Sequence, residues 1–218
     1  MTRIKICGLK TLADVAAVNK YLPEYVGFVF APTKRFVTDE QAIAMRQSLN
    51  KDIRAAGVFV NEPIAHVISL CSRGIIDVAQ LHGDESEEYI RELKKETDTI
   101  VIKAVKVQSG EQVAERMSQE ADYMLFDTYK KGTLGGTGER FSLDILAEGL
   151  RQGIARGKAV KPYFLAGGLS TANIKEILEQ RTDGMPVCYG VDVSTGVETD
   201  GVKDEAKIKD FINLVRGV

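Results

Sequence analysis

The chain has 218 residues, 44% hydrophobic and 28% charged, so it is long enough to bury a substantial core. Its formal net charge of -2 provides no global positive field, which argues against nucleic acid or an anionic membrane as a partner. No apolar run approaches the ~18 residues of a transmembrane helix, and the first residues lead into a strand pattern, not a signal peptide. We therefore expect a cytoplasmic protein that binds neither nucleic acid nor membrane.

Eight apolar, β-branched segments recur along the chain, most of them about 25–30 residues apart, which is the length of a strand–helix unit. They are residues 3–7, 26–30, 55–60, 76–82, 100–105, 122–127, 162–166 and 187–192. Helical patterns lie between them, and several begin with a capping-box sequence. The capping pairs are Thr11 with Asp14, Thr38 with Gln41, and Ser109 with Gln112.

Strand–helix alternation requires parallel strand pairing and therefore an α/β fold. Eight units in this length fit a single (β/α)8 TIM barrel, which we expect to span residues 1–218 as one domain. An open doubly wound sheet is the competing architecture. It usually needs fewer strands, and its first turn often carries a GxGxxG sequence, which is absent here.

The first strand ends in a cysteine that would lie at the mouth of such a barrel, where the carboxyl ends of the strands meet. Alternation places Lys5 and Cys7 on one face, with Lys5 one layer below the thiol. A buried lysine needs an anionic partner, and its charge would help to form a thiolate. The alternative for Cys7 is a small buried hydrophobe. Cys71 and Cys188 are interpreted as structural, since three distant cysteines form neither a disulfide framework nor a metal site.

The sixth strand ends in Asp127, which shares a face with Tyr123 and Leu125. A carboxyl group at this position can act as a general acid if burial raises its pKa, or it can simply form a turn or a helix cap. Its position in the same mouth as Cys7 favours the catalytic interpretation.

Two loops have the character of phosphate-binding segments. Gly167 and Gly168 follow the seventh strand, where backbone N–H groups can approach an anion closely. Asp192, Ser194 and Thr195 end the eighth strand and add hydroxyl and backbone groups. The loops after strands seven and eight of a barrel often bind phosphate. A tight turn is the alternative for the two glycines, but two such loops in both expected positions favour a phosphate site.

Further polar residues are expected around the mouth. Arg35 follows the second strand and could hold a second acidic group bidentately, or it could form a solvated basic pair with Lys34. Gln80 and His82 share a face at the end of the fourth strand, and we interpret His82 as lining, not as a catalyst. The glycine-rich residues 135–138 follow the sixth strand and could be a second phosphate cradle or a lid.

These segments, in this order and spacing, resemble the phosphoribosylanthranilate isomerase family of tryptophan biosynthesis, over nearly the whole chain. The matching segments are Lys5-Ile6-Cys7-Gly8, Gly27-Phe28-Val29-Phe30 with Arg35, Gly57-Val58-Phe59-Val60-Asn61, Gln80-Leu81-His82-Gly83, Leu125-Phe126-Asp127, Gly135-Gly136-Thr137-Gly138 with Phe141, Leu165-Ala166-Gly167-Gly168-Leu169, and Gly190 to Glu198.

The resemblance implies a cofactor-free and metal-free Amadori rearrangement of N-(5-phosphoribosyl)anthranilate, the third step of tryptophan synthesis from chorismate. It implies that Asp127 is the general acid and Cys7 the general base. It further implies that Arg35 holds the anthranilate carboxylate and Asp192 a sugar hydroxyl. The phosphate would be held by Gly167, Gly168, Ser194 and Thr195. The partner would be this small phosphoribosyl substrate, with the chain acting as a monomer or a homodimer.

Two other functions stay open at this point. One is another phosphosugar-barrel isomerase, such as the related enzyme of the histidine pathway, which has an aspartate at the end of strand one and a phosphate at each end of its substrate. Cys7 argues against it, whereas residues 135–138 are the one feature in its favour. The other is a non-catalytic barrel that binds a phosphorylated ligand, which would need the anion loops but not both Cys7 and Asp127.

Overall fold

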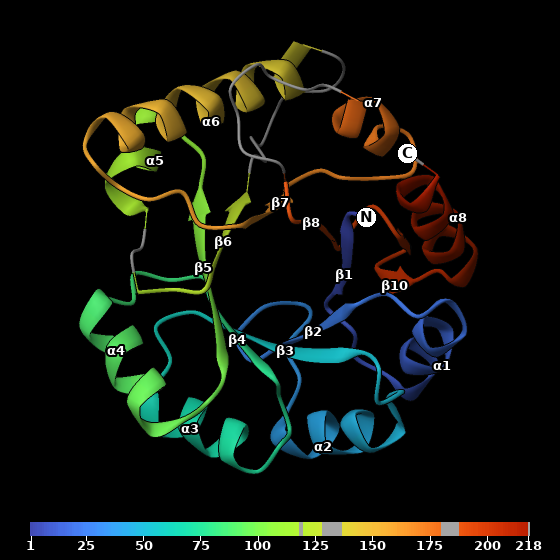
Figure 1. The fold of residues 1–218 in the computed structure, drawn as a ribbon. Helices are drawn as coiled ribbons and strands as arrows, with labels where there is room; N and C mark the ends of the chain where they lie inside the picture. Colours follow the sequence, from blue (N-terminus) through green and yellow to red (C-terminus); the bar gives the residue numbers. More distant parts are fainter. Residues whose placement is uncertain (118–119, 128–136, 180–187, 218) are drawn as a thin grey trace.

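Eight parallel strands close into a barrel surrounded by helices (Figure 1). The computed structural model describes residues 1–117, 120–127, 137–179 and 188–217, with the backbone only for 137–142. The strands are β1 (Arg3–Cys7), β2 (Tyr25–Val29), β3 (Arg54–Phe59), β4 (Val78–Leu81), β5 (Ile100–Lys106), β6 (Tyr123–Asp127), β7 (Tyr163–Ala166) and β8 (Gly190–Val193). Strand β1 pairs with both β2 and β8, so the expected (β/α)8 barrel is confirmed and the open sheet is excluded.

Eight helices and a short hairpin complete the described part of the chain. They are α1 (Leu12–Tyr21), α2 (Asp39–Ser48), α3 (Ile64–Ser72), α4 (Glu87–Glu96), α5 (Gly110–Arg116), α6 (Thr137–Ala155), α7 (Ile174–Glu179) and α8 (Glu205–Arg216), with the hairpin β9 (Glu198–Thr199) and β10 (Val202–Lys203) before α8. Within the described residues, none of these helices is long and apolar enough to cross a membrane.

The helix starts follow the capping sequences closely. Thr11 and Thr38 each form a reciprocal capping box at the start of α1 and α2, as expected. Ser109 caps α5 by accepting a hydrogen bond from the backbone of Gln112 at 3.2 Å. The side chain of Gln112, however, accepts from the backbone of Gln108 at 3.3 Å, so this cap is not reciprocal.

Two strands begin at least two residues later than the sequence pattern indicates. Strand β4 starts at Val78, not at residue 76, because Asp77 bonds the backbone of Ala55 with both its N–H group and its carboxylate. The carboxylate thereby replaces a ladder bond. Strand β8 starts at Gly190, not at residue 187. Residues 180–187 lie outside the described residues.

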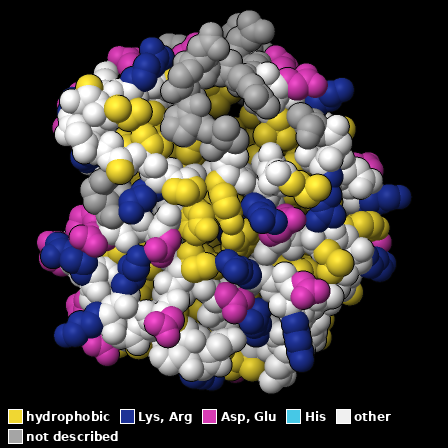
Figure 2. Space-filling view, in the orientation of Figure 1, with side chains coloured by type: hydrophobic (Ala, Val, Ile, Leu, Met, Phe, Trp, Pro, Cys, Tyr) yellow, Lys and Arg dark blue, Asp and Glu magenta, His cyan; other side chains and the backbone are white. Residues whose placement is uncertain are grey.

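Alternation along the strands separates the two sides of the barrel wall. Ile4 and Ile6 pack outward into the core under the helices, whereas Lys5 and Cys7 point inward. The barrel interior is filled mainly by a second, smaller cluster. Its members are Tyr25, Ala56, Val78, Ile102, Ala104, Leu125, Phe164 and Ala166. Hydrophobic side chains also gather in the middle of the molecular face in Figure 2, with charged side chains mostly around them.

Candidate active site

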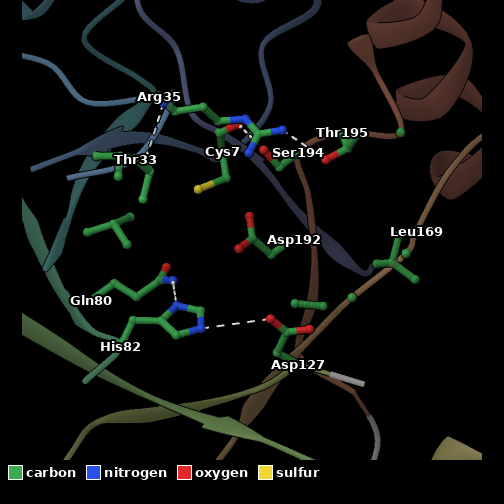
Figure 3. A pocket seen from close by; sticks show the side chains of 16 residues that line it. Cys7, Thr33, Arg35, Gln80, His82, Asp127, Leu169, Asp192, Ser194 and Thr195 are labelled. Carbon is green, nitrogen blue, oxygen red and sulfur yellow. Dashed lines mark hydrogen bonds and ion pairs between the residues drawn. The ribbon is translucent and has the colours of Figure 1, made fainter. Parts of the chain in front are cut away.

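A pocket of about 400 Å³ opens at the carboxyl ends of the barrel strands (Figure 3). All ten residues expected from the sequence line it: Cys7, Arg35, Gln80, His82, Asp127, Gly167, Gly168, Asp192, Ser194 and Thr195. The wall also includes Val29 and Val58, which the sequence patterns do not predict as site residues. These two valines form an apolar cluster with Cys7 and Ala31. The barrel thus brings together a thiol, a carboxyl group, the two loops expected to bind an anion, and an apolar wall.

Cys7 ends β1 with its sulfur directed into the pocket (Figure 3). A neighbouring glycine makes room for it. A Cβ atom on Gly27 would lie 2.8 Å from Cys7 Sγ and 3.1 Å from Lys5 Nζ. Any side chain at Gly27 would therefore displace the thiol or the lysine beneath it, which gives this strand position a functional reason to be glycine.

The anionic partner that Lys5 requires is Asp192. Lys5 Nζ lies 3.0 Å from Asp192 Oδ1, and both side chains are buried inside the barrel. The two residues stand side by side in the register of β1 with β8. Burial alone would lower the pKa of Lys5, but the nearby Asp192 and Cys7 outweigh it and the pKa is raised. Lys5 therefore remains charged one layer below the thiol.

The Cys7 thiol is held in its neutral form. Burial raises its pKa, and the opposing effect of Lys5 is insufficient because Asp192 acts in the same direction as burial. A thiol of raised pKa forms less thiolate, but that thiolate is a stronger base.

We expect Cys7 to react with iodoacetamide along a pH profile whose midpoint lies above the ordinary cysteine pKa of about 8.5. The measurement is the rate of carbamidomethylation of Cys7, followed by mass spectrometry between pH 6 and 11. The Cys7→Ser variant supplies the background from Cys71 and Cys188, whose pKa values burial also raises. A thiol that is fully reactive at pH 7 would contradict the expectation.

His82 connects Gln80 to Asp127 across the pocket floor (Figure 3). Gln80 Nε2 lies 3.2 Å from His82 Nδ1, and His82 Nε2 lies 3.8 Å from Asp127 Oδ2. Burial lowers the pKa of His82 despite the attraction of Asp127, so the ring is neutral at pH 7. With the Gln80 amide donating to Nδ1, the ring hydrogen lies on Nε2 and faces the carboxyl group. The sequence predicted only a lining role for His82, because the contact with Asp127 depends on the spacing of β4 and β6.

The loops after β7 and β8 meet at the rim of the pocket. Gly167 and Gly168 have positive φ angles of 96° and 67°, a conformation that favours glycine and exposes backbone N–H groups. The loops touch through a bridge between Ser170 and Gly196, where any Cβ atom on Gly196 would overlap the carbonyl of Leu169. This close contact fixes the two expected phosphate loops against each other.

Arg35 lies over the end of β1 and is not a solvated basic residue. Its Nε and Nη2 atoms donate to the two carboxylate oxygens of Glu198 at 2.7 and 2.9 Å, and Nη2 also donates to Thr195 Oγ1 at 2.8 Å. Burial raises the pKa of Glu198, but the hydrogen bonds from Arg35 and Lys203 outweigh it and lower the pKa to about 2. Glu198 lies in one of the segments that match the family, but no sequence pattern predicts a role for it.

The glycine-rich segment expected as a cradle or lid falls largely outside the described structure. Gly135 and Gly136 are outside the described residues, and residues 137 and 138 begin α6.

Fold and site together define a (β/α)8-barrel enzyme that pairs a thiol and a carboxyl group beneath the two loops that follow β7 and β8. Residues 4–214 match the profile of the family described as N-(5′-phosphoribosyl)anthranilate (PRA) isomerase. The chain therefore belongs to the N-(5′-phosphoribosyl)anthranilate isomerase family.

Individual relatives agree with this assignment. The chain is 46% identical to N-(5′-phosphoribosyl)anthranilate isomerase of Lachnoclostridium phytofermentans over 213 residues, which cover 96% of this chain and 95% of that protein. It resembles the crystal structure of the enzyme from Thermotoga maritima with a TM-score of 0.80 at 31% identity, covering 100% of both chains. A phosphoribosylanthranilate isomerase in complex with reduced 1-(o-carboxyphenylamino)-1-deoxyribulose 5-phosphate matches with a TM-score of 0.78 at 29% identity, again over 100% of both chains.

Proposed function

We propose that this chain converts N-(5′-phosphoribosyl)anthranilate into 1-(o-carboxyphenylamino)-1-deoxyribulose 5-phosphate, with Cys7 and Asp127 as base and acid. The observation that carries this proposal is the presence of both groups in one pocket of a family member. The reaction needs an acid to open the sugar ring and a base to remove a carbon-bound proton, so one of each is required.

The reaction begins with protonation of the furanose ring oxygen by Asp127, which opens the ring to a protonated Schiff base. The Cys7 thiolate then removes the proton from C2′ and forms an enolamine. The enolamine tautomerises to the ketone as its hydroxyl loses a proton and C1′ gains one. The protein has then given one proton and taken one, so the conversion is a net isomerisation.

Substrate binding would use the two anionic ends of the molecule. Backbone and hydroxyl groups of Gly167, Gly168, Ser194 and Thr195 would hold the phosphate. The aromatic ring would lie against the apolar wall of Val29 and Val58, and the ring carboxylate would meet Arg35. Asp192 would accept a hydrogen bond from a sugar hydroxyl. Gln80 would also bind substrate, since its Oε1 atom is buried and has no hydrogen-bond partner in the described residues.

Replacing Arg35 with alanine is expected to weaken substrate binding and to leave the chemical step largely intact. A charge-assisted hydrogen bond contributes about 1.5–3 kcal/mol, so KM should rise about 10- to 100-fold while kcat stays within threefold. Steady-state kinetics on the Arg35→Ala variant and on the wild type measures this. A large loss of kcat at unchanged KM would instead assign Arg35 a chemical role.

The proposed activity is tested by following the fluorescence of freshly generated phosphoribosylanthranilate as the purified protein consumes it. Rapid loss of the signal, with the ketose product identified by mass spectrometry, supports the proposal. A folded protein that leaves the signal unchanged would overturn it in favour of a binding barrel or of another phosphosugar substrate.

The odd number of widely spaced cysteines supports a cytoplasmic location for the protein, where thiols stay reduced. The assembly would be a monomer or a homodimer, and one solved relative is described as dimeric.

A further inference from the structure

Glu198 is a buried carboxylate shared by two cations at the rim of the pocket. Its oxygens accept hydrogen bonds from Arg35 Nε and Nη2 at 2.7 and 2.9 Å, and from Lys203 Nζ at 2.8 Å. The side chains of Glu198 and Lys203 are only 4% and 1% exposed. The cations Arg35 and Lys203 and the carboxylate of Glu198 together carry a net charge of +1. One further carboxylate from a ligand would neutralise it.

Contacts within the described residues hold the side chain of Arg35 through its stem and two of its three guanidinium nitrogen atoms. Its stem crosses the end of β1 above Gly8, where a Cβ atom would overlap Arg35 Cδ and lie 3.2 Å from Nε. Its Nε and Nη2 hydrogens are taken by Glu198 and Thr195. Within the described part of the chain, Nη1 makes no hydrogen bond, so this nitrogen is the donor left for a ligand.

The hairpin after β8 holds the carboxylate in place. Glu198 and Lys203 are opposite each other in the antiparallel β9–β10 pair. Lys203 also donates to the backbone oxygen of Ser194 at 3.0 Å, and Ser194 Oγ donates to the backbone oxygen of Cys7 at 3.0 Å. The carboxylate is thus tied to the loop after β8 and, through that loop, to the end of β1.

From this geometry we propose that Glu198 is a positioning residue for substrate recognition: it holds the guanidinium of Arg35 so that Nη1 binds the carboxylate on the aromatic ring of the substrate. This inference rests on the proposed function, because it requires a substrate with such a carboxylate. Glu198 itself does not touch the substrate. Its removal would leave Arg35 free to rotate, and the lost orientation would weaken recognition of the ring carboxylate specifically.

The test compares two ligands that differ only in that carboxylate: the reduced product analogue, reduced 1-(o-carboxyphenylamino)-1-deoxyribulose 5-phosphate, and its phenylamino counterpart without the carboxyl group. Isothermal titration calorimetry gives a Kd for each, and their ratio is the carboxylate selectivity. Any general weakening of the phosphate loop by the mutation affects both ligands and cancels in the ratio. The Glu198→Gln variant should lose about 10- to 100-fold in this selectivity.

Two further variants make the result specific. In an Arg35→Ala background, adding Glu198→Gln should change the selectivity by less than about twofold, since the group that Glu198 positions is gone. Glu198→Asp keeps the negative charge beside Lys203, so this variant can be measured if Glu198→Gln fails to fold. It should also lose carboxylate selectivity, but by a smaller factor than Glu198→Gln. Glu88→Gln, which removes an exposed carboxylate on α4, is the matched control and should behave as wild type.

Unchanged selectivity in Glu198→Gln, or in Glu198→Asp if the glutamine variant does not fold, would overturn the proposal. So would an additional loss in the Arg35→Ala background, because a purely structural role persists without the arginine. A wild-type protein that isomerises the substrate yet shows no carboxylate selectivity would overturn this inference alone. Absence of isomerase activity in the wild type would instead remove the proposed function itself.

Discussion

Substitution of Asp127 by asparagine is expected to reduce kcat by about 10²- to 10⁴-fold, which is the usual contribution of a proton-transfer group. Asparagine keeps the size of the side chain and its place at the end of β6, but its amide cannot deliver a proton to the ring oxygen. KM should change little, because the residues proposed to bind the phosphate and the ring carboxylate lie elsewhere in the pocket. Steady-state kinetics with the fluorescence assay measures both constants.

Asp84→Asn is the matched control for this substitution. Asp84 is an exposed aspartate that pairs with Arg116 at the molecular surface, so its replacement should leave kcat unchanged. If Asp127→Asn retained a kcat near that of wild type, ring opening would need another acid. His82 would then be the next group to examine, because its Nε2 hydrogen faces the same region of the pocket.

Substitution of Cys7 by alanine is expected to cost a similar factor in kcat, about 10²- to 10⁴-fold. No other thiol lines the described pocket, so the proposed step that removes the C2′ proton would lose its base. Alanine only removes the sulfur, and the resulting space opens to the pocket, so the protein should fold normally. Circular dichroism and thermal unfolding check the fold, and the fluorescence assay measures kcat.

The control here is Cys71→Ala, which removes a half-buried thiol from α3 and should leave kcat as in wild type. Near-normal kcat in Cys7→Ala would show that the base lies elsewhere and would contradict the assignment. A Cys7→Ser variant adds a further comparison. Its hydroxyl preserves the shape but is a far weaker acid than a thiol, so it should be almost as impaired as the alanine variant.

Strand periodicity alone predicted which side chains face the inside of the barrel and line the pocket. A period of two decides that Lys5 and Cys7 face inward while Ile4 and Ile6 face the helices. Barrel closure then forces the strand ends to converge, so residues as distant in the sequence as Cys7 and Asp127 line one pocket.

Periodicity could not predict which polar groups pair across the barrel. The partner of Lys5 is decided by the register of β1 with β8, and that of Arg35 by a hairpin that begins after β8. Both pairings depend on distances of about 3 Å between side chains, whereas a sequence pattern specifies only the face on which a residue lies. Periodicity does not predict the need for glycine at position 27 either, since that need arises from the thiol on the neighbouring strand.

With Cys7 as the proposed base, the ion pair beneath the thiol would couple substrate binding to the ease of thiolate formation. Because Asp192 lies 3.0 Å from Lys5, the two charges form a short dipole, and Cys7 experiences only the difference between them. A sugar hydroxyl that donates to Asp192 would spread part of its negative charge away from the lysine. More of the lysine's field would then reach the sulfur, so that thiolate formation becomes easier when the sugar is in place than in the empty pocket. Such an arrangement would keep the buried thiol unreactive between turnovers.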